Sequence, residues 1–126
     1  MQVDQLDEFA KRWPTWFDFN GDGMRTAMPN GFSGIGEGWR QLLWDLCVEL
    51  EPHVQDLNRK LATEEPPASF EVLQVKEKFG QLRFYVNHHS GPIDGCIGKA
   101  KVLASTTCID CGQPAQLSTK GRWHVA

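Results

Sequence analysis

The stretch of sequence that decides the fold is residues 70–86, FEVLQVKEKFGQLRFYV. Its two ends, residues 70–76 and 82–86, are rich in the β-branched and aromatic residues that favour strands. The loop between them, residues 77–81, is short and contains a glycine. Two such runs around a short glycine-containing loop predict an antiparallel β-hairpin. In the second strand, we expect one face to carry Leu82, Phe84 and Val86, and the other to carry Arg83 and Tyr85.

Helical periodicity before and after this hairpin supplies the elements that would cover it. From Glu37, apolar residues recur at spacings of three and four as far as Leu50, and the pattern resumes over residues 53–61. Pro52 interrupts the pattern, so the helix is expected to kink there or to start again. A second amphipathic helix is predicted over residues 93–106. Its apolar stripe is expected to consist of Ile93, Ile97, Ala100, Leu103 and Ala104.

The N-terminal part of the chain combines a short helix with a glycine-rich segment. Asp4, or a residue near it, can cap a helix, which is expected to end at Trp13 because a residue before proline avoids helical geometry. Residues 14–38 contain too much glycine for a regular element and predict a long ordered loop.

These patterns predict an α+β fold. It would consist of an antiparallel β-hairpin or a small three-stranded sheet, packed by two main helices, with a long glycine-rich N-terminal loop. The length of 126 residues suits a single domain spanning residues 1–126. Its expected parts are the N-terminal helix and loop (1–36), a helical part (37–65), and a part with the hairpin, a helix and a cysteine motif (66–126).

Composition and charge exclude several classes of protein. Hydrophobic residues make up 40% of the chain and charged residues 23%, which is typical of globular proteins and not of disordered ones. No apolar run is long enough for a membrane helix, and the acidic N-terminus does not resemble a signal peptide. We therefore expect a cytoplasmic protein without a membrane partner.

The net charge of −3 is unevenly distributed along the chain. Residues 37–65 hold seven acidic and three basic residues, whereas residues 94–126 hold two acidic and four basic ones. An acidic helix suits a basic protein partner through electrostatic steering, although the same pattern is typical of a solvated helix face. A sequence pI near 5.8 disfavours binding driven by phosphate groups.

The clearest chemical motif is Cys108-Ile109-Asp110-Cys111-Gly112. Two cysteines at this spacing can hold one tetrahedral zinc ion, which makes zinc the candidate cofactor. Such a turn supplies two of the four ligands, and His124 is the nearest further candidate, followed by Cys96. A pair of reduced thiols in an ordinary turn and a redox-active pair are the alternatives.

Two other motifs carry weaker signals. Residues 18–23, Asp-Phe-Asn-Gly-Asp-Gly, match the first half of a calcium loop, but the position that needs a bidentate glutamate is Pro29, so no calcium is expected. His88 and His89, with Asp94 nearby, offer acid–base groups without a nucleophile in the same motif. Exposed loop histidines are the simpler interpretation.

The chain resembles a set of small, largely uncharacterised proteins encoded by bacteria and their phages. The likeness covers roughly residues 30–126. Its elements, in order, are Gly36-Glu37-Gly38-Trp39 leading to Leu46-Cys47, the hairpin segment 74–86, and Thr107-Cys108-x-x-Cys111-Gly112 with Trp123 downstream. The resemblance implies a further Cys- or His-containing stretch after the tryptophan, which would complete a zinc site. It also implies a mobile-element or conflict-system context, and no established activity.

We therefore expect a non-enzymatic protein-binding module, such as an immunity protein or inhibitor that blocks a toxin or a host enzyme. The residues expected to face the partner are Trp16, Phe19, Asp22, Glu49 and Asp56. The alternative is a zinc-knuckle protein associated with nucleic acid through its basic C-terminal third, with Lys99, Lys101, Lys120 and Arg122. A hydrolase that uses His88, His89 and Asp94 is a third interpretation.

Overall fold

The computed structural model describes residues 3–17, 35–117 and 123–125. It confirms an α+β fold with a β-hairpin and two main helices. The elements in chain order are α1 (Val3–Arg12), the short 3-10 helix η2 (Glu37–Trp39), α2 (Arg40–Leu61), β1 (Val72–Lys78), β2 (Gln81–Val86), α3 (Gly91–Ala104), β3 (Ala115–Leu117) and β4 (Trp123–Val125).

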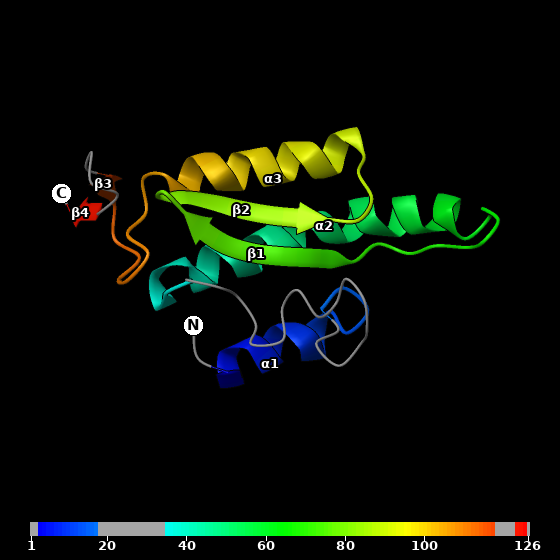
Figure 1. The fold of residues 1–126 in the computed structure, drawn as a ribbon, viewed down its shortest axis with the longest axis horizontal. Helices are drawn as coiled ribbons and strands as arrows, with labels where there is room; N and C mark the ends of the chain where they lie inside the picture. The colour runs from blue at the N-terminus through cyan, green and yellow to red at the C-terminus, as the bar shows by residue number, and fades with distance from the viewer. Residues whose placement is uncertain (1–2, 18–34, 118–122, 126) are drawn as a thin grey trace.

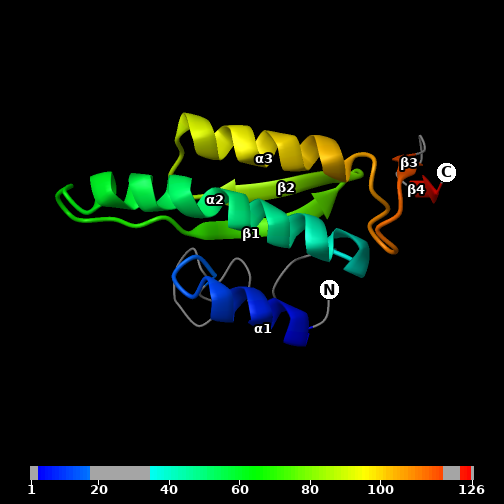
Figure 2. The ribbon, with the colours of Figure 1, turned by 180° about the vertical axis from the view of Figure 1, so that it is seen from behind.

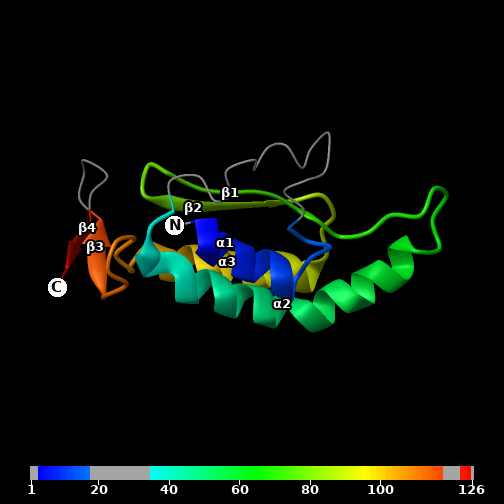
Figure 3. The ribbon, with the colours of Figure 1, turned by 90° about the horizontal axis from the view of Figure 1, so that it is seen from below.

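The helices all lie on one side of the β1–β2 hairpin, as Figure 3 shows. The helix α3 runs beside β2, and α2 lies behind the two strands and packs against α3 (Figure 1). The helix α1 lies on the other side of α2, as the view from behind in Figure 2 makes clear. Two ion pairs, Arg12 with Glu51 and Arg40 with Glu8, join α1 to α2.

Strands β3 and β4 form a second antiparallel ribbon at one end of the molecule (Figure 1). They do not add to the hairpin, so the described residues form two separate two-stranded sheets rather than one three-stranded sheet.

The β1–β2 hairpin is longer and its turn tighter than the sequence predicts. Val75 pairs with Phe84 and Lys78 pairs with Gln81, so only Phe79 and Gly80 form the turn. Both turn residues have positive φ, 55° for Phe79 and 79° for Gly80. Positive φ at both central positions matches the right-handed twist of the two strands, which explains why a two-residue turn closes this hairpin.

The two faces of the hairpin differ as predicted. Leu82, Phe84 and Val86 are buried against the helices, whereas Tyr85 is exposed and Arg83 half-buried on the opposite face.

The helix α2 continues through Pro52 as one element and bends at about its middle (Figure 3). A proline inside a helix removes one backbone hydrogen bond and crowds the preceding turn, which accounts for the bend.

The helix α3 begins at Gly91, two residues earlier than predicted, because the hydroxyl oxygen of Ser90 caps it by accepting a hydrogen bond from the Ile93 N–H at 3.4 Å. One predicted core residue of α3 is misplaced: Leu103 is 55% exposed.

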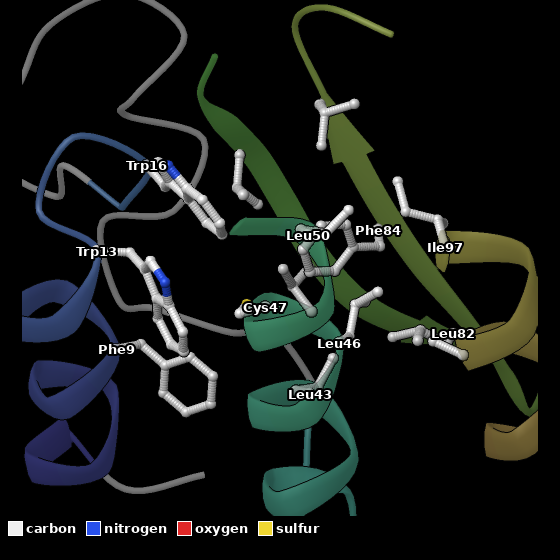
Figure 4. Packing of buried hydrophobic residues seen from close by; sticks show 14 of the residues in the cluster. Phe9, Trp13, Trp16, Leu43, Leu46, Cys47, Leu50, Leu82, Phe84 and Ile97 are labelled. Carbon is white, nitrogen blue, oxygen red and sulfur yellow. The ribbon is translucent and has the colours of Figure 1, made fainter. Parts of the chain in front are cut away.

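The core joins aromatic residues near α1 to aliphatic residues of α2, the hairpin and α3 (Figure 4). The rings of Trp13 and Trp16 stack with centroids 5.5 Å apart, and Trp16 also meets Phe70 edge-on at 5.3 Å. The aromatic cluster therefore connects α1 and the residues after it to the start of the hairpin.

None of the helices that the structure describes is long and apolar enough to cross a membrane.

Candidate functional site

The cysteine motif forms a compact turn that rests on the start of α2. The Gly112 N–H donates to the Cys108 carbonyl oxygen at 2.8 Å, and Gly112 takes a positive φ of 79° to close the turn. The Gly38 N–H donates to the carbonyl oxygen of Ile109 at 2.8 Å. The indole N–H of Trp39 donates to the carbonyl oxygen of Thr107 at 2.9 Å. Figure 1 shows this turn, in orange, beside the beginning of α2.

Glycine at two positions of residues 36–39 allows this close approach. A Cβ atom at Gly38 would fall far inside van der Waals contact of the Cys108 carbonyl oxygen and the Gly112 nitrogen. A Cβ atom at Gly36 would collide in the same way with the Ile109 carbonyl oxygen. Both glycines fall in the segment predicted as a long loop, and their packing against the cysteine turn was not predicted from the sequence. The signal in the sequence that could have indicated this role is the pair of glycines two residues apart, Gly36 and Gly38, directly before the predicted helix.

The environment of Cys108 favours its thiolate. The backbone N–H of Cys111, and more weakly that of Asp110, hydrogen-bond to the sulfur and lower the pKa of the Cys108 thiol, against the opposing effect of burial. Cys108 is buried and Cys111 is exposed. A sulfur that accepts backbone N–H groups in a tight turn fits the donor chemistry of a thiolate-bound metal such as zinc.

The described residues supply two cysteine side chains to this turn and no third ligand. Within residues 3–17, 35–117 and 123–125, no group of three or more His, Cys, Asp or Glu side chains is placed to hold a metal ion. Cys96, the further candidate ligand, lies in α3 and lines a groove against α2. His124 lies in β4, paired with Gln116, and its side chain falls outside the described residues.

His88 and His89 do not form a catalytic cluster with other groups in the described part of the chain. His89 Nδ1 lies 2.7 Å from Asp94 Oδ1, and both side chains are more than half exposed. This pair joins the residues before α3 to its first turn.

Of the five residues expected to face a partner, the structure places one in the core and two on the exposed surface, and the other two lie outside the described residues. Trp16 does not lie on the surface as the prediction required, because it is 6% exposed and packs in the core between Trp13 and Phe70. Glu49 and Asp56 are exposed on α2, as expected. Phe19 and Asp22, with the rest of the calcium-like segment 18–23, lie outside the described residues.

An apolar groove lies between α2 and α3 and was not predicted from the sequence. It has a volume of 540 Å³, and its floor is formed by Leu42, Leu46 and Ala100. Val102 and Leu103 form one lip and are 71% and 55% exposed. The helical periodicity of the sequence places Val102 outside the apolar stripe of α3. It does not show that α2 packs beside α3 and so forms a groove there.

Charged groups border this groove on the α2 side. Asp45 and Glu49 line it, and Lys99 Nζ reaches Glu49 Oε1 from α3 at 3.4 Å. Partial burial and the nearby Glu49 carboxylate raise the pKa of the Cys96 thiol, so Cys96 is protonated at neutral pH. The groove is therefore apolar in its centre and acidic along one edge.

Comparison of the chain with protein-family models, curated proteins and solved structures found no match. The resemblance to bacterial and phage proteins therefore stays a prediction from the sequence.

Proposed function

We propose that this chain is a non-enzymatic protein-binding module, an immunity protein or inhibitor of a bacterial or phage conflict system that blocks a toxin or a host enzyme. The observation that carries the proposal is the open apolar groove between α2 and α3, with its exposed lip and its acidic edge. The context comes from the family resemblance.

The exposed lip of the groove supports a protein partner. Val102 and Leu103 are large apolar side chains held in water on adjacent positions of a rigid helix. Burying one such side chain fully contributes roughly 1.5–3 kcal/mol, so the pair offers the centre of an interface. Apolar patches with a polar border are typical of protein interaction sites.

The acidic edge supports a basic partner surface. Asp45 and Glu49 border the groove, and Asp56 continues the row of exposed carboxylates along α2. Lys99 is paired with Glu49 and Arg59 with Asp56, so these two cations offset part of this charge. Complementary charge raises the rate of association more than it raises affinity, which is an advantage for an inhibitor that must capture its target quickly.

The first test is capture of a partner by tagged full-length protein from its own cells, after nuclease treatment, with identification by mass spectrometry. We expect one stoichiometric protein with the unaltered chain. Leu103→Asp should reduce the captured amount at least tenfold, because it places a charge at the apolar centre of the interface. Val48→Asp is the matched control, since Val48 is 45% exposed on α2 and does not line the groove.

Two results would refute the proposal. One is the absence of any stoichiometric protein partner. The other is an equal loss of the partner with Leu103→Asp and Val48→Asp while both variants keep the thermal stability of the unaltered chain.

A zinc-knuckle protein associated with nucleic acid is the second candidate function. The observation that favours it is the tight turn that carries Cys108 and Cys111, closed by the Gly112 N–H on the Cys108 carbonyl oxygen and held against the start of α2 by Gly38 and Trp39. Cys108 and Cys111 would hold the zinc ion, which would tie the turn together and neutralise the two thiolates. The basic residues Lys99 and Lys101 lie in α3, the helix that leads into the turn.

A further inference from the structure

We infer that the outer face of the β1–β2 hairpin, together with Phe79 at its tip, binds single-stranded nucleic acid. The outer face is the side of the hairpin turned away from the helices, and consists of Gln74, Lys76, Lys78, Gln81, Arg83 and Tyr85. This surface is separate from the α2–α3 groove and from the cysteine turn, so the inference does not rest on the functions proposed above.

The strand register gives the outer face its charge. Lys76 lies opposite Arg83, and Lys78 lies opposite Gln81. Glu77 pairs with Leu82 and therefore belongs to the inner face, whose other members are buried. The outer face thus carries three cations and no carboxylate, in a protein whose net charge is −3.

The arrangement of these cations disfavours the free hairpin. Like charges directly opposite each other on neighbouring strands destabilise a sheet, and Lys76 and Arg83 are such a pair. Neither these two side chains nor Lys78 forms an ion pair with any other residue that the structure describes. A polyanion along this face would relieve the repulsion between the two side chains.

The tip of the hairpin adds an exposed aromatic ring. Phe79 is 78% exposed, and its φ of 55° lies in the left-handed region, which is unfavourable for a residue with a side chain. Asparagine or glycine is the usual residue at this turn position. An exposed aromatic side chain kept at a strained position is typical of a contact residue.

A second exposed ring completes the surface. Tyr85 is 43% exposed at the far end of β2 from the tip. Lysine nitrogens lie near both rings: Lys78 Nζ is 5.6 Å from the centroid of Phe79, and Lys76 Nζ is 5.8 Å from that of Tyr85. With about 3.3 Å per strand residue, the two rings are roughly 15–20 Å apart, enough for several nucleotides between them.

Exposed rings beside cations indicate which polyanion fits. Proteins that bind single strands combine aromatic platforms, on which bases stack, with cations that contact the phosphates. A duplex hides the faces of its bases, and an acidic protein segment has no bases to stack on Phe79 or Tyr85. The outer face therefore matches a single strand better than either of these ligands.

The test measures binding of the full chain to fluorescein-labelled dT12 by fluorescence anisotropy. Binding should weaken as salt rises from 50 to 200 mM, since phosphate contacts release counterions. Lys76→Gln with Arg83→Gln should lower the affinity at least tenfold and flatten the slope of log K against log salt by about 1.4, because each contact on a single strand contributes about 0.7. Lys11→Gln with Lys60→Gln makes the same charge change on α1 and α2 and should leave the affinity unchanged.

Phe79→Asn separates a contact role from a structural role. It should lower the affinity for dT12 at least fivefold, because a base can no longer stack on the ring. The salt slope should stay unchanged, because no contact with a phosphate is removed. It should also raise the unfolding temperature, because asparagine tolerates the left-handed turn position better than phenylalanine. A structural role for Phe79 predicts the opposite change in stability.

Several results would overturn the inference. The first is that dT12 does not bind at 50 mM salt. The second is that the two double variants lose affinity equally, and the third is that a 12-base-pair duplex binds more tightly than dT12. Equal binding of poly-glutamate, with Phe79→Asn having no effect, would identify the surface as one for acidic protein segments. Leu103→Asp should bind dT12 normally, so a failure of the protein-binding proposal would not affect this result.

Discussion

At the residue scale, glycines that look alike in the sequence have opposite roles. Gly36 and Gly38 lie against the backbone of the cysteine turn, where a side chain would collide with carbonyl oxygens. Gly95 and Gly98 lie on the exposed side of α3, where an added Cβ would meet nothing within 4 Å. The first pair is required by packing, whereas the second pair only weakens its helix.

Alanine substitution should separate these two roles. Gly38→Ala should lower the free energy of unfolding by about 2 kcal/mol or more, because the colliding atoms are backbone and cannot move aside cheaply. Gly95→Ala should raise it by about 0.5–1 kcal/mol, because alanine favours the helix. Urea denaturation of the two variants and the unaltered chain checks both signs. Equal effects would show that the contact between Gly38 and the turn is not rigid.

At the scale of elements, the cysteine turn and the start of α2 depend on each other. The turn is closed by its own backbone hydrogen bonds and is held against α2 by Gly38 and Trp39. Backbone N–H groups of Cys111 and Asp110 in the same turn lower the pKa of the Cys108 thiol. The turn, residues 107–114, is supported by the start of a helix that lies far from it in sequence.

The zinc content of the purified protein tests whether the cysteine turn binds a metal ion. We expect zinc to copurify with the chain, and Cys108→Ser and Cys111→Ser each to remove most of it, because each takes away one of the two thiolates of the turn. Cys96→Ser is the control and should keep the zinc, since Cys96 lies in the α2–α3 groove. Elemental analysis by mass spectrometry after dialysis measures the ratio of zinc to protein. Zinc-free unaltered protein, or loss of zinc in all three variants, contradicts the assignment.

At the scale of the whole molecule, a single core joins α1, α2, the hairpin and α3. Cys47 lies in it and is fully buried. Burial, and to a smaller extent the charge of Glu51, raises the pKa of the Cys47 thiol well above its ordinary value of 9.0. Cys47 therefore stays protonated in the folded chain at a pH at which the unfolded chain would ionise it.

This difference in the pKa of Cys47 between the folded and the unfolded chain predicts that the free energy of unfolding decreases at alkaline pH. Because the folded pKa is raised, the contribution of Cys47 is fully present below pH 9.0, and it decreases as the pH rises from there towards the folded pKa. The decrease should approach about 1.4 kcal/mol per pH unit. The measurement is urea denaturation between pH 8 and 10, with reductant, of the unaltered chain and of Cys47→Ala. Their difference in stability should shrink with rising pH, whereas a constant difference would mean that the thiol ionises inside the fold.

The residues 70–86 show how far sequence patterns predict this fold. Alternation of apolar and polar residues identified the hairpin and its buried face, because a strand repeats every two residues. It could not identify the turn, since a phenylalanine at positive φ contradicts the local preferences on which turn prediction rests. The helical spacing located α2 and α3 but misplaced Leu103, because the direction of a helix face depends on what packs against it.

Some features of the candidate surfaces can be predicted from the sequence, and others depend on the tertiary structure. The cysteine motif, the acidic helix and the alternating charges of the hairpin are visible in the sequence, because each depends on residues that are close along the chain. The α2–α3 groove, the support of the turn by Gly38 and the burial of Trp16 were decided only by the tertiary structure. Each of these depends on side chains or backbone atoms brought together from distant segments, and no local pattern records which distant segment will be the neighbour.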